Sequence, residues 1–243
     1  MFFYETHLHT SQASACASVT GAEHARQYKE QGYDGIMITD HFFGGNTSVP
    51  SRLPWEERVN RFCSGYEDAK REGDRIGLKV FFGWEQAYYG ETEFLIYGLD
   101  KEWLLAHPEM EDWSIEEQFA QVDAAGGLVV QAHPFRNRYY ISKIRLYPNH
   151  VHAIEGVNAG NTVLDNQLAL AYGKEYGLTM TGGSDCHGKE NLGGGTGFEK
   201  KLYSIEDYIR EVKAGRVAGI APIPPKKKNL SKKDIVLPVK VYL

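Results

Sequence analysis

The chain alternates short apolar runs with longer amphipathic segments. Most of the short runs are rich in Val, Ile, Phe or Tyr, which is typical of strands buried on both faces of a sheet. The expected strands are Phe2–Glu5, Gly35–Thr39, Lys79–Trp84, Phe94–Gly98, Leu128–Ala132, Ala153–Val157, Thr179–Gly182 and Arg216–Ala221.

Five amphipathic segments between these runs predict helices. Ser114 and Glu117 have the spacing of a capping box, and Ser204 is placed to cap a later helix. Gly32 and Gly177 follow helical patterns and are placed to end them. The expected helices are Ala22–Gln31, Trp55–Glu72, Ser114–Ala125, Thr162–Tyr176 and Ser204–Ala214. Strand–helix alternation of this kind predicts an α/β fold with a parallel sheet, either open or closed into a barrel.

The length and composition favour one globular domain. The chain has 243 residues, of which 42% are hydrophobic and 24% charged. A single α/β barrel takes about 250 residues, so we expect one domain over residues 1–221. Residues 222–243 form a Pro- and Lys-rich C-terminal tail, in which positions 226–234 carry five Lys and one Asp. We expect a solvated tail, with a patch that attracts a partner or a phosphate group as the alternative.

The charge and the cysteines narrow the classes of partner. The net charge is −5, from 27 basic and 32 acidic residues, whereas a general nucleic-acid-binding protein is normally basic. No run approaches the roughly 18 apolar residues of a membrane span, and the N-terminal segment lacks the pattern of a signal peptide. Cys16, Cys63 and Cys186 form no C-x-x-C pair, which favours a cytoplasmic protein. The oligomeric state stays open.

Candidate chemistry gathers at the ends of the predicted strands. Five of the nine His lie there, together with two carboxylates: His7, His9, His41, His133, His187, Glu85 and Asp185. In a parallel α/β barrel this is the face that carries active sites. Imidazoles mixed with carboxylates suit Zn²⁺, Mn²⁺ or Fe²⁺ better than Mg²⁺ or Ca²⁺, which prefer oxygen ligands.

The order of these motifs resembles the PHP family, named for polymerase and histidinol phosphatase. The motifs are His7-Leu8-His9, Thr39-Asp40-His41, Gly83-Trp84-Glu85, His133-Pro134 and Gly183-Ser184-Asp185-Cys186-His187. The resemblance implies a single distorted (β/α)7 barrel with the metal site at the C-terminal ends of its strands. It also implies two or three divalent transition metals (Zn, Mn or Fe) and hydrolysis of phosphate esters.

The resemblance further implies a ligand set and catalytic roles for His7, His9, Glu85, Asp185 and His187. One metal would take His7, His9, Glu85 and Asp185. A second would share Glu85 and take His133, and a third would take His41 and His187.

Two departures from the family pattern concern these ligands. Many members carry a ligating His or Asp where this chain has Ala15, which leaves Cys16 as a soft ligand or a packed residue. Many members also add a His to the second metal. The nearest candidate, His152, precedes its strand, so Asn158, Glu155 or water would have to replace it.

The expected substrate is a small phosphorylated metabolite. Glu85 and Asp185 contribute −2, so two divalent ions bring the site to +2 and three bring it to +4, which attracts phosphate. Two ions about 3.5–4 Å apart can hold a bridging hydroxide as the nucleophile. Arg136 and Arg138 follow His133 and could hold the phosphate group, or could be surface charges.

We therefore expect a metal-dependent phosphomonoesterase. A phosphodiesterase or nuclease acting on nucleotides or short strands is the first alternative. A non-catalytic regulatory PHP domain and a barrel amidohydrolase are the others.

Overall fold

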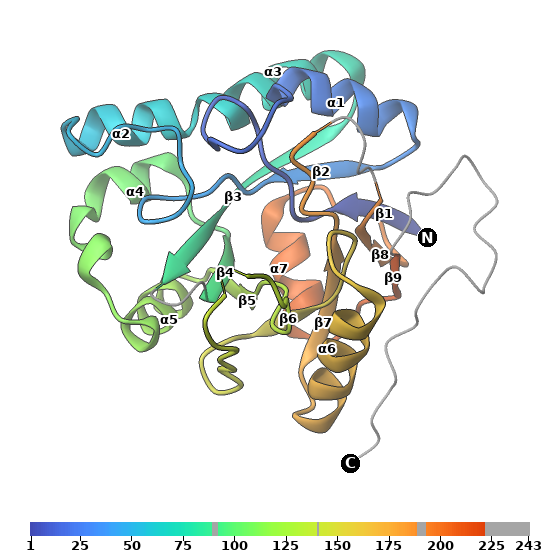
Figure 1. The fold of residues 1–243 in the computed structure, drawn as a ribbon. Coiled ribbons are helices and arrows are strands. Elements are labelled where there is room, and N and C mark those ends of the chain that lie inside the picture. Colours follow the sequence, from blue (N-terminus) through green and yellow to red (C-terminus); the bar gives the residue numbers. More distant parts are fainter. Residues whose placement is uncertain (89–91, 140, 189–192, 222–243) are drawn as a thin grey trace.

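The computed structural model describes residues 1–88, 92–139, 141–188 and 193–221. The predicted Pro- and Lys-rich tail, residues 222–243, lies outside the described residues. Figure 1 shows the strands arranged around a ring, with most of the helices on the outside.

Nine strands form one sheet in the described part of the chain, in the order β7-β6-β5-β4-β3-β2-β1-β8-β9. They are β1 (Phe2–Glu5), β2 (Gly35–Ile38), β3 (Lys79–Tyr88), β4 (Thr92–Tyr97), β5 (Leu128–Gln131), β6 (Ala153–Asn158), β7 (Thr179–Gly183), β8 (Gly195–Phe198) and β9 (Gly219–Ala221).

The expectation of a wholly parallel sheet is wrong for two strands. β4 runs antiparallel to both β3 and β5, and β8 runs antiparallel to β1 and β9. Only three residues separate β3 from β4, and parallel neighbours need a crossover of about a dozen residues or more. The fold is therefore mixed α/β, and the strict (β/α)7 count is not confirmed.

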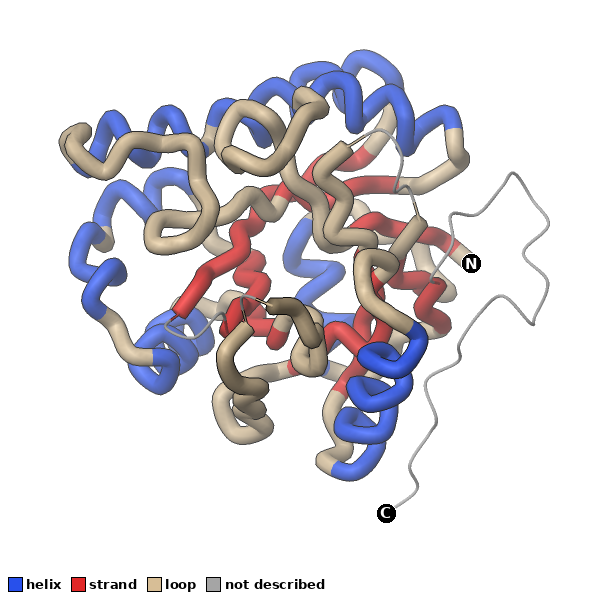
Figure 2. The backbone as a smooth tube through the Cα atoms, in the orientation of Figure 1, coloured by secondary structure: helices blue, strands red, loops and turns tan. Residues whose placement is uncertain are grey.

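The sheet curls into a nearly closed barrel (Figure 2). Near the seam, Thr6 Oγ1 donates to Gly182 O (2.8 Å), and Gly182 N donates to Thr196 Oγ1 (3.0 Å). These bonds join β7 to β8 and to the segment that follows β1. Beyond the strands, Leu8 forms a parallel bridge with Cys186, which brings the segments after β1 and β7 together.

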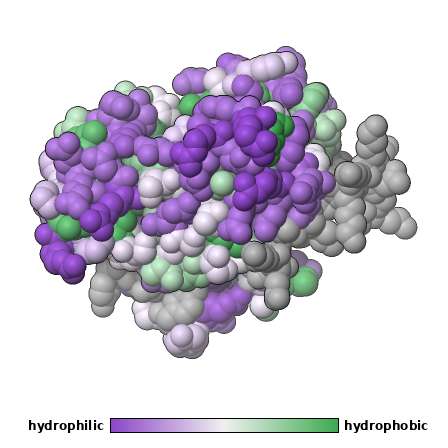
Figure 3. Space-filling view, turned by 90° about the horizontal axis from the view of Figure 1, so that it is seen from above, coloured by the Kyte–Doolittle hydropathy of each residue, from purple (hydrophilic) through white to green (hydrophobic). Residues whose placement is uncertain are grey.

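The helices lie mainly outside the ring (Figure 1). α1 and α3 pack against each other and against β2, α3 also covers β3, and α6 covers β6. The face formed by α1 and α3, at the top of Figure 1, is predominantly hydrophilic when it is seen from above (Figure 3). The helices are α1 (Gly21–Glu30), α2 (Trp55–Phe62), α3 (Ser64–Ile76), α4 (Lys101–Ala106), α5 (Ile115–Ala124), α6 (Val163–Glu175) and α7 (Ile205–Lys213), with a 3₁₀ turn, η1, at Pro108–Asp112.

Two helix predictions need correction. The single helix expected over Trp55–Glu72 is two helices, α2 and α3, that meet at Cys63. The break allows Phe62 of α2 to pack against Phe42 and Phe43, while α3 packs on β3. Ser204 does precede α7, but its side chain makes no capping hydrogen bond.

The core fills the barrel and the space beneath the helices. Trp84, Phe94 and Tyr97 are among its largest fully buried side chains. Tyr208 of α7 packs against Tyr97 of β4, and also against Phe198 of β8, so this helix contacts two separate parts of the sheet. No helix in the described ranges is long and apolar enough to cross a membrane.

Candidate metal centre

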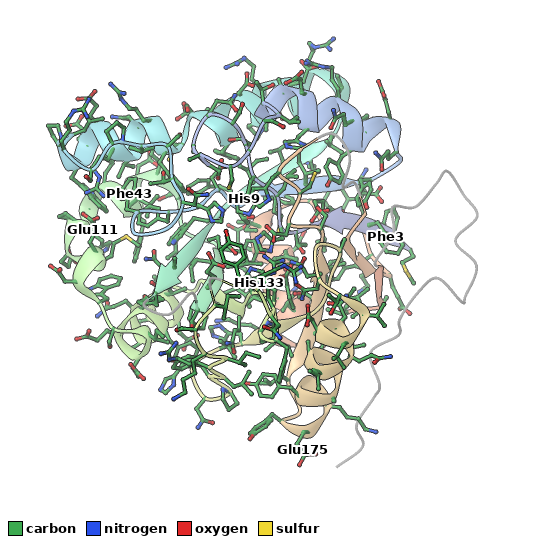
Figure 4. The ribbon with its side chains drawn as sticks, viewed as in Figure 1. Phe3, His9, Phe43, Glu111, His133 and Glu175 are labelled. Atoms are coloured by element: carbon green, nitrogen blue, oxygen red, sulfur yellow. The ribbon has the colours of Figure 1, made fainter. Side chains whose placement is uncertain are left out.

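The side chains predicted from the strand ends meet at one end of the barrel. Four overlapping groups, each of three side chains, have ligand atoms within 4.8 Å of one another. Figure 4 shows His9 and His133 near the centre of the ring of strands. The groups are His7–His9–Asp185, His7–Glu85–His133, His9–His41–His187 and His41–Glu85–Glu93. All seven predicted metal ligands are among them.

Backbone pairing beyond the regular strands holds these motifs together. Asp185 N donates to His7 O (2.9 Å), and His9 N donates to Cys186 O (3.1 Å). His41 and Glu85 form a second parallel bridge. Gly183 permits the close approach, because a Cβ there would lie only 2.5 Å from His7 Cβ. The ligands therefore come together through the closure of the barrel.

Two of these residues have strained backbones. Among the described residues, His133 (φ 27°) and Asp185 (φ 55°) are the non-glycine positions with positive φ. Such conformations are costly for residues with a Cβ, and they concentrate at functional sites. At these two strand ends the chain turns sharply, which aims both side chains into the cluster.

The geometry of the first ligand set fits a metal ion. His7 Nε2 lies 3.1 Å from His9 Nε2, 3.2 Å from Glu85 Oε1 and 3.4 Å from Asp185 Oδ1. His9 Nε2 lies 3.0 Å from Asp185 Oδ1 and 3.5 Å from Glu85 Oε2. Tetrahedral Zn–N and Zn–O bonds of about 2.0–2.2 Å place ligand atoms about 3.3 Å apart. His7, His9 and Asp185 therefore have the separations that a shared ion requires, and Glu85 lies within 3.5 Å of both imidazoles.

The second ligand set lies beside the first. His133 Nε2 is 3.0 Å from Glu85 Oε1 and 3.4 Å from Glu93 Oε2. Glu93, on β4, was not predicted as a site residue. It lies on β4, whose antiparallel direction the sequence did not predict. Its position shortly after Glu85 in the chain is the one feature that could have suggested Glu93 as a site residue.

A third set contains imidazoles that face one another. His41 Nε2 and His187 Nε2 lie 3.3 Å apart. On its other side, His41 Nδ1 lies 2.7 Å from Glu85 Oε2. This imidazole therefore also contacts the carboxylate that the first two sets share.

Surrounding groups orient the ligands. Glu155 Oε1 lies 3.0 Å from Nδ1 of His7 and so fixes the ring with Nε2 facing the cluster. Ser14 Oγ lies 3.2 Å from His9 Nδ1 and donates to Asp40 Oδ1 (2.7 Å). Asp40, part of a predicted motif, thus supports His9 through Ser14. His152 instead pairs with Asp123 (2.8 Å), away from the cluster.

The pKa shifts reflect crowded charges. Burial lowers the pKa of His7, but Glu155, Asp185 and Glu85 outweigh it and hold the pKa well above its usual value. Burial raises the pKa of Asp185, but Arg136 and His7 outweigh it and hold that pKa well below its usual range. Burial and the neighbouring Glu85 raise the pKa of Glu93 to about 8. The carboxylates thus favour positive charge at the centre of the cluster.

The two predicted substrate arginines lie in different surroundings. Arg136 Nη1 pairs with Asp185 Oδ2 (2.5 Å), and its other nitrogens donate to Asn158 and Asn161. Arg138 donates to Gly160 O (2.7 Å) and is about one-third exposed. Of these two arginines, Arg136 lines a small pocket next to the cluster and Arg138 does not. The pocket is also lined by Glu93, His133, Lys143 and Arg145.

One protein-family model matches part of the chain. Residues 163–217, from α6 to beyond α7, match a family model described as PHP-associated. No curated protein matches the chain.

Three solved structures have a similar fold. A two-domain protein from Bacteroides vulgatus, containing a predicted PHP-like metal-dependent phosphoesterase, has 16% identity and a TM-score of 0.67 over 90% of this chain. This chain spans 64% of that protein's length. A provisionally named metal-dependent phosphoesterase from Bifidobacterium adolescentis has 18% identity and a TM-score of 0.56, covering 87% of this chain and 96% of its own. An amidohydrolase from Chromobacterium violaceum, solved with sulfate and without metal, has 14% identity and a TM-score of 0.55, covering 98% of each chain. The family model covers less than a quarter of the chain, and the three solved structures show that the chain shares their fold.

Proposed function

We propose that the protein is a metal-dependent hydrolase of phosphate esters, acting on a small phosphorylated metabolite as a phosphomonoesterase. The observation that carries this proposal is the overlap of the four ligand groups, in which His7, His9, His41 and Glu85 each belong to two groups. Shared ligands hold ions close together, as in the two-metal sites of phosphatases. The names of two structural neighbours, both phosphoesterases, agree with it.

The charge of the site is less positive than the sequence indicated. Besides Glu85 and Asp185, Glu93 and Glu155 also contact the histidines, and Arg136 adds one positive charge. With all four carboxylates ionised, the formal charge is −3, so two divalent ions give +1 and three give +3. Ions there would activate a water molecule as the nucleophile and offset charge on the phosphoryl oxygens.

The chain's own cations favour an anionic substrate. Lys143 and Arg145 line the small pocket next to His133 and Glu93. Their segment is fixed to the end of β5, because Gln131 Nε2 donates to Arg145 O (2.7 Å). Arg136 lies at the boundary between this pocket and Asp185. Nη1 and Nη2 each carry a second N–H beyond their bonds to Asp185 and Asn158, and these donors can meet a phosphoryl oxygen.

A paired assay tests the proposal. The metal-loaded protein should hydrolyse p-nitrophenyl phosphate with a higher kcat/KM than bis(p-nitrophenyl) phosphate. Arg136→Ala should lower kcat/KM about ten- to a hundredfold, since a charge-assisted contact contributes about 1.5–3 kcal/mol. Arg26→Ala is the matched control, because Arg26 is a surface residue paired with Glu72.

Two results would contradict the proposal, and a third would correct the role of Arg136 within it. Preference for the diester would favour a phosphodiesterase or nuclease. No turnover with Zn²⁺, Mn²⁺ or Fe²⁺ would favour a non-catalytic binding domain. Activity of Arg136→Ala within about twofold of the parent would leave the phosphomonoesterase intact but remove Arg136 from substrate binding. Metal content is measured in parallel, because Arg136 also contacts the ligand Asp185.

A further inference from the structure

The second ligand set lacks a defined third protein ligand. Glu85 and His133 face each other at 3.0 Å, and the sequence left Glu155, Asn158 or water to complete the set. The hydrogen bonds of Glu155 and Asn158 show how well each side chain is placed to bind an ion beside His133.

Glu155 already uses both of its carboxylate oxygens. Oε1 contacts His7 Nδ1 at 3.0 Å. Oε2 accepts from His133 N (3.0 Å) and from Asn158 Nδ2 (2.9 Å). Glu155 therefore orients His7 and the His133 backbone, and both of its oxygens are engaged in these contacts.

Asn158 is occupied in the same way. Its Oδ1 accepts from Arg136 Nη2 (3.0 Å) and from Gly160 N (2.9 Å), and its Nδ2 donates to Glu155. An amide oxygen beside a guanidinium is poorly placed to bind a cation, because the neighbouring positive charge opposes it.

Glu93 also lies close to His133, the imidazole of the second set. Its Oε2 lies 3.4 Å from His133 Nε2, and its Oε1 lies 4.0 Å from His41 Nδ1. The side chain is only 13% exposed. The pairing of β4 with β5 continues past the strands, since Ala132 N donates to Glu93 O (3.0 Å), and this fixes Glu93 beside His133.

Within the described ranges Glu93 forms ion-pair contacts with His41 and His133, and with no Lys or Arg. Buried charges in proteins are paired or coordinate metals, so an ionised Glu93 between these two imidazoles fits a metal ligand.

We propose that Glu93 is a metal ligand and completes the second set with Glu85 and His133. This inference rests on the metal centre of the proposed function and deepens it. The set then has two carboxylates and one imidazole, whereas the His41–His187 side offers nitrogen ligands. The second position is accordingly richer in oxygen, which suits Mn²⁺ or Fe²⁺.

A metal titration tests the assignment without using activity. Protein stripped with a chelator is titrated with Mn²⁺ alone by calorimetry, and bound metal is counted after gel filtration. Glu93→Gln should weaken one site at least about tenfold while the other sites remain. Glu116→Gln, an exposed carboxylate on α5, should bind as the parent does. The thermal unfolding of the stripped Glu93→Gln protein is compared with that of the stripped parent, so that misfolding is detected.

The outcomes separate this inference from the proposed function. If the parent binds fewer than two ions, the two-metal centre itself is wrong. If the parent binds at least two ions and Glu93→Gln binds the same number with the same affinity, only the assignment of Glu93 is wrong. If Glu93→Gln unfolds when stripped of metal, Glu93→Asp is titrated instead. Its shorter side chain retracts the carboxylate from His133, so undiminished affinity there would also overturn the assignment.

Discussion

Cys16 stands next to the position at which many members of the resembled family carry a ligating His or Asp. Burial raises the pKa of its thiol, but hydrogen bonds with His187 and His41 outweigh burial and lower the pKa to about 6. By contrast, burial raises the pKa of Cys63 to about 12 and that of Cys186 to about 11. Cys16 is exposed, whereas the other two thiols are buried.

These differences predict one fast-reacting thiol in the metal-free protein. The thiolate is the reactive form, so alkylation of Cys16 by iodoacetamide should rise with pH through about 6 and then level off. Mass spectrometry locates the label, with Cys63 and Cys186 as internal controls. Cys16→Ser should abolish the fast phase. A rate that keeps rising through pH 8–9 would show that the imidazoles do not act on this thiol.

At the level of single residues, the sequence predicted the members of the cluster that lie in recognisable motifs. Glu155 was named as a stand-in ligand, but its hydrogen bonds give it an orienting role. Glu93 belongs to no motif, and its approach to His133 depends on the reversed direction of β4. Spacing along the chain cannot reveal a contact that strand direction creates.

Helix caps provide a test at the level of the element. Thr20–Glu23, Ser114–Glu117 and Thr162–Asp165 each form a capping box. Ser114→Ala should lower the free energy of unfolding by about 1 kcal/mol, because it removes the hydrogen bond to Glu117 N. Ser204→Ala is a matched control and should change it by less than about 0.5 kcal/mol, because Ser204 makes no such bond. Urea unfolding measures both, and equal losses would contradict the difference between the caps.

Elements with local signals were predicted best. The box at Ser114 and the glycine after α6 placed two helices within a few residues. β8 (Gly195–Phe198) was missed, because its glycines indicate a loop when read locally. Gly195 lies where a Cβ would be 3.0 Å from Tyr4 O, so the glycine serves close packing against β1. α2 and α3 were merged because their pattern continues through Cys63, and only packing against Phe42 and Phe43 separates them.

Across the whole molecule, barrel closure is what assembles the site. His7 and Asp185 are 178 residues apart in the chain (185 − 7), and a backbone hydrogen bond of 2.9 Å joins them. This bond holds the strained backbone of Asp185, while His133 N donates to Glu155 Oε2 (3.0 Å). The sequence predicted that strand ends would converge, but the nearly closed sheet with two reversed strands depends on long-range pairing that local patterns do not contain.

We expect these strand ends to hold at least two metal ions. An anomalous-scattering map from crystals grown with Mn²⁺ or Zn²⁺ measures this. We expect one peak bonded to His7, His9, Glu85 and Asp185, and a second bonded to His133 and Glu85, at about 2.0–2.2 Å from the ligand atoms. A map with fewer than two peaks at these side chains, from crystals in which the metal is present in excess, would contradict it.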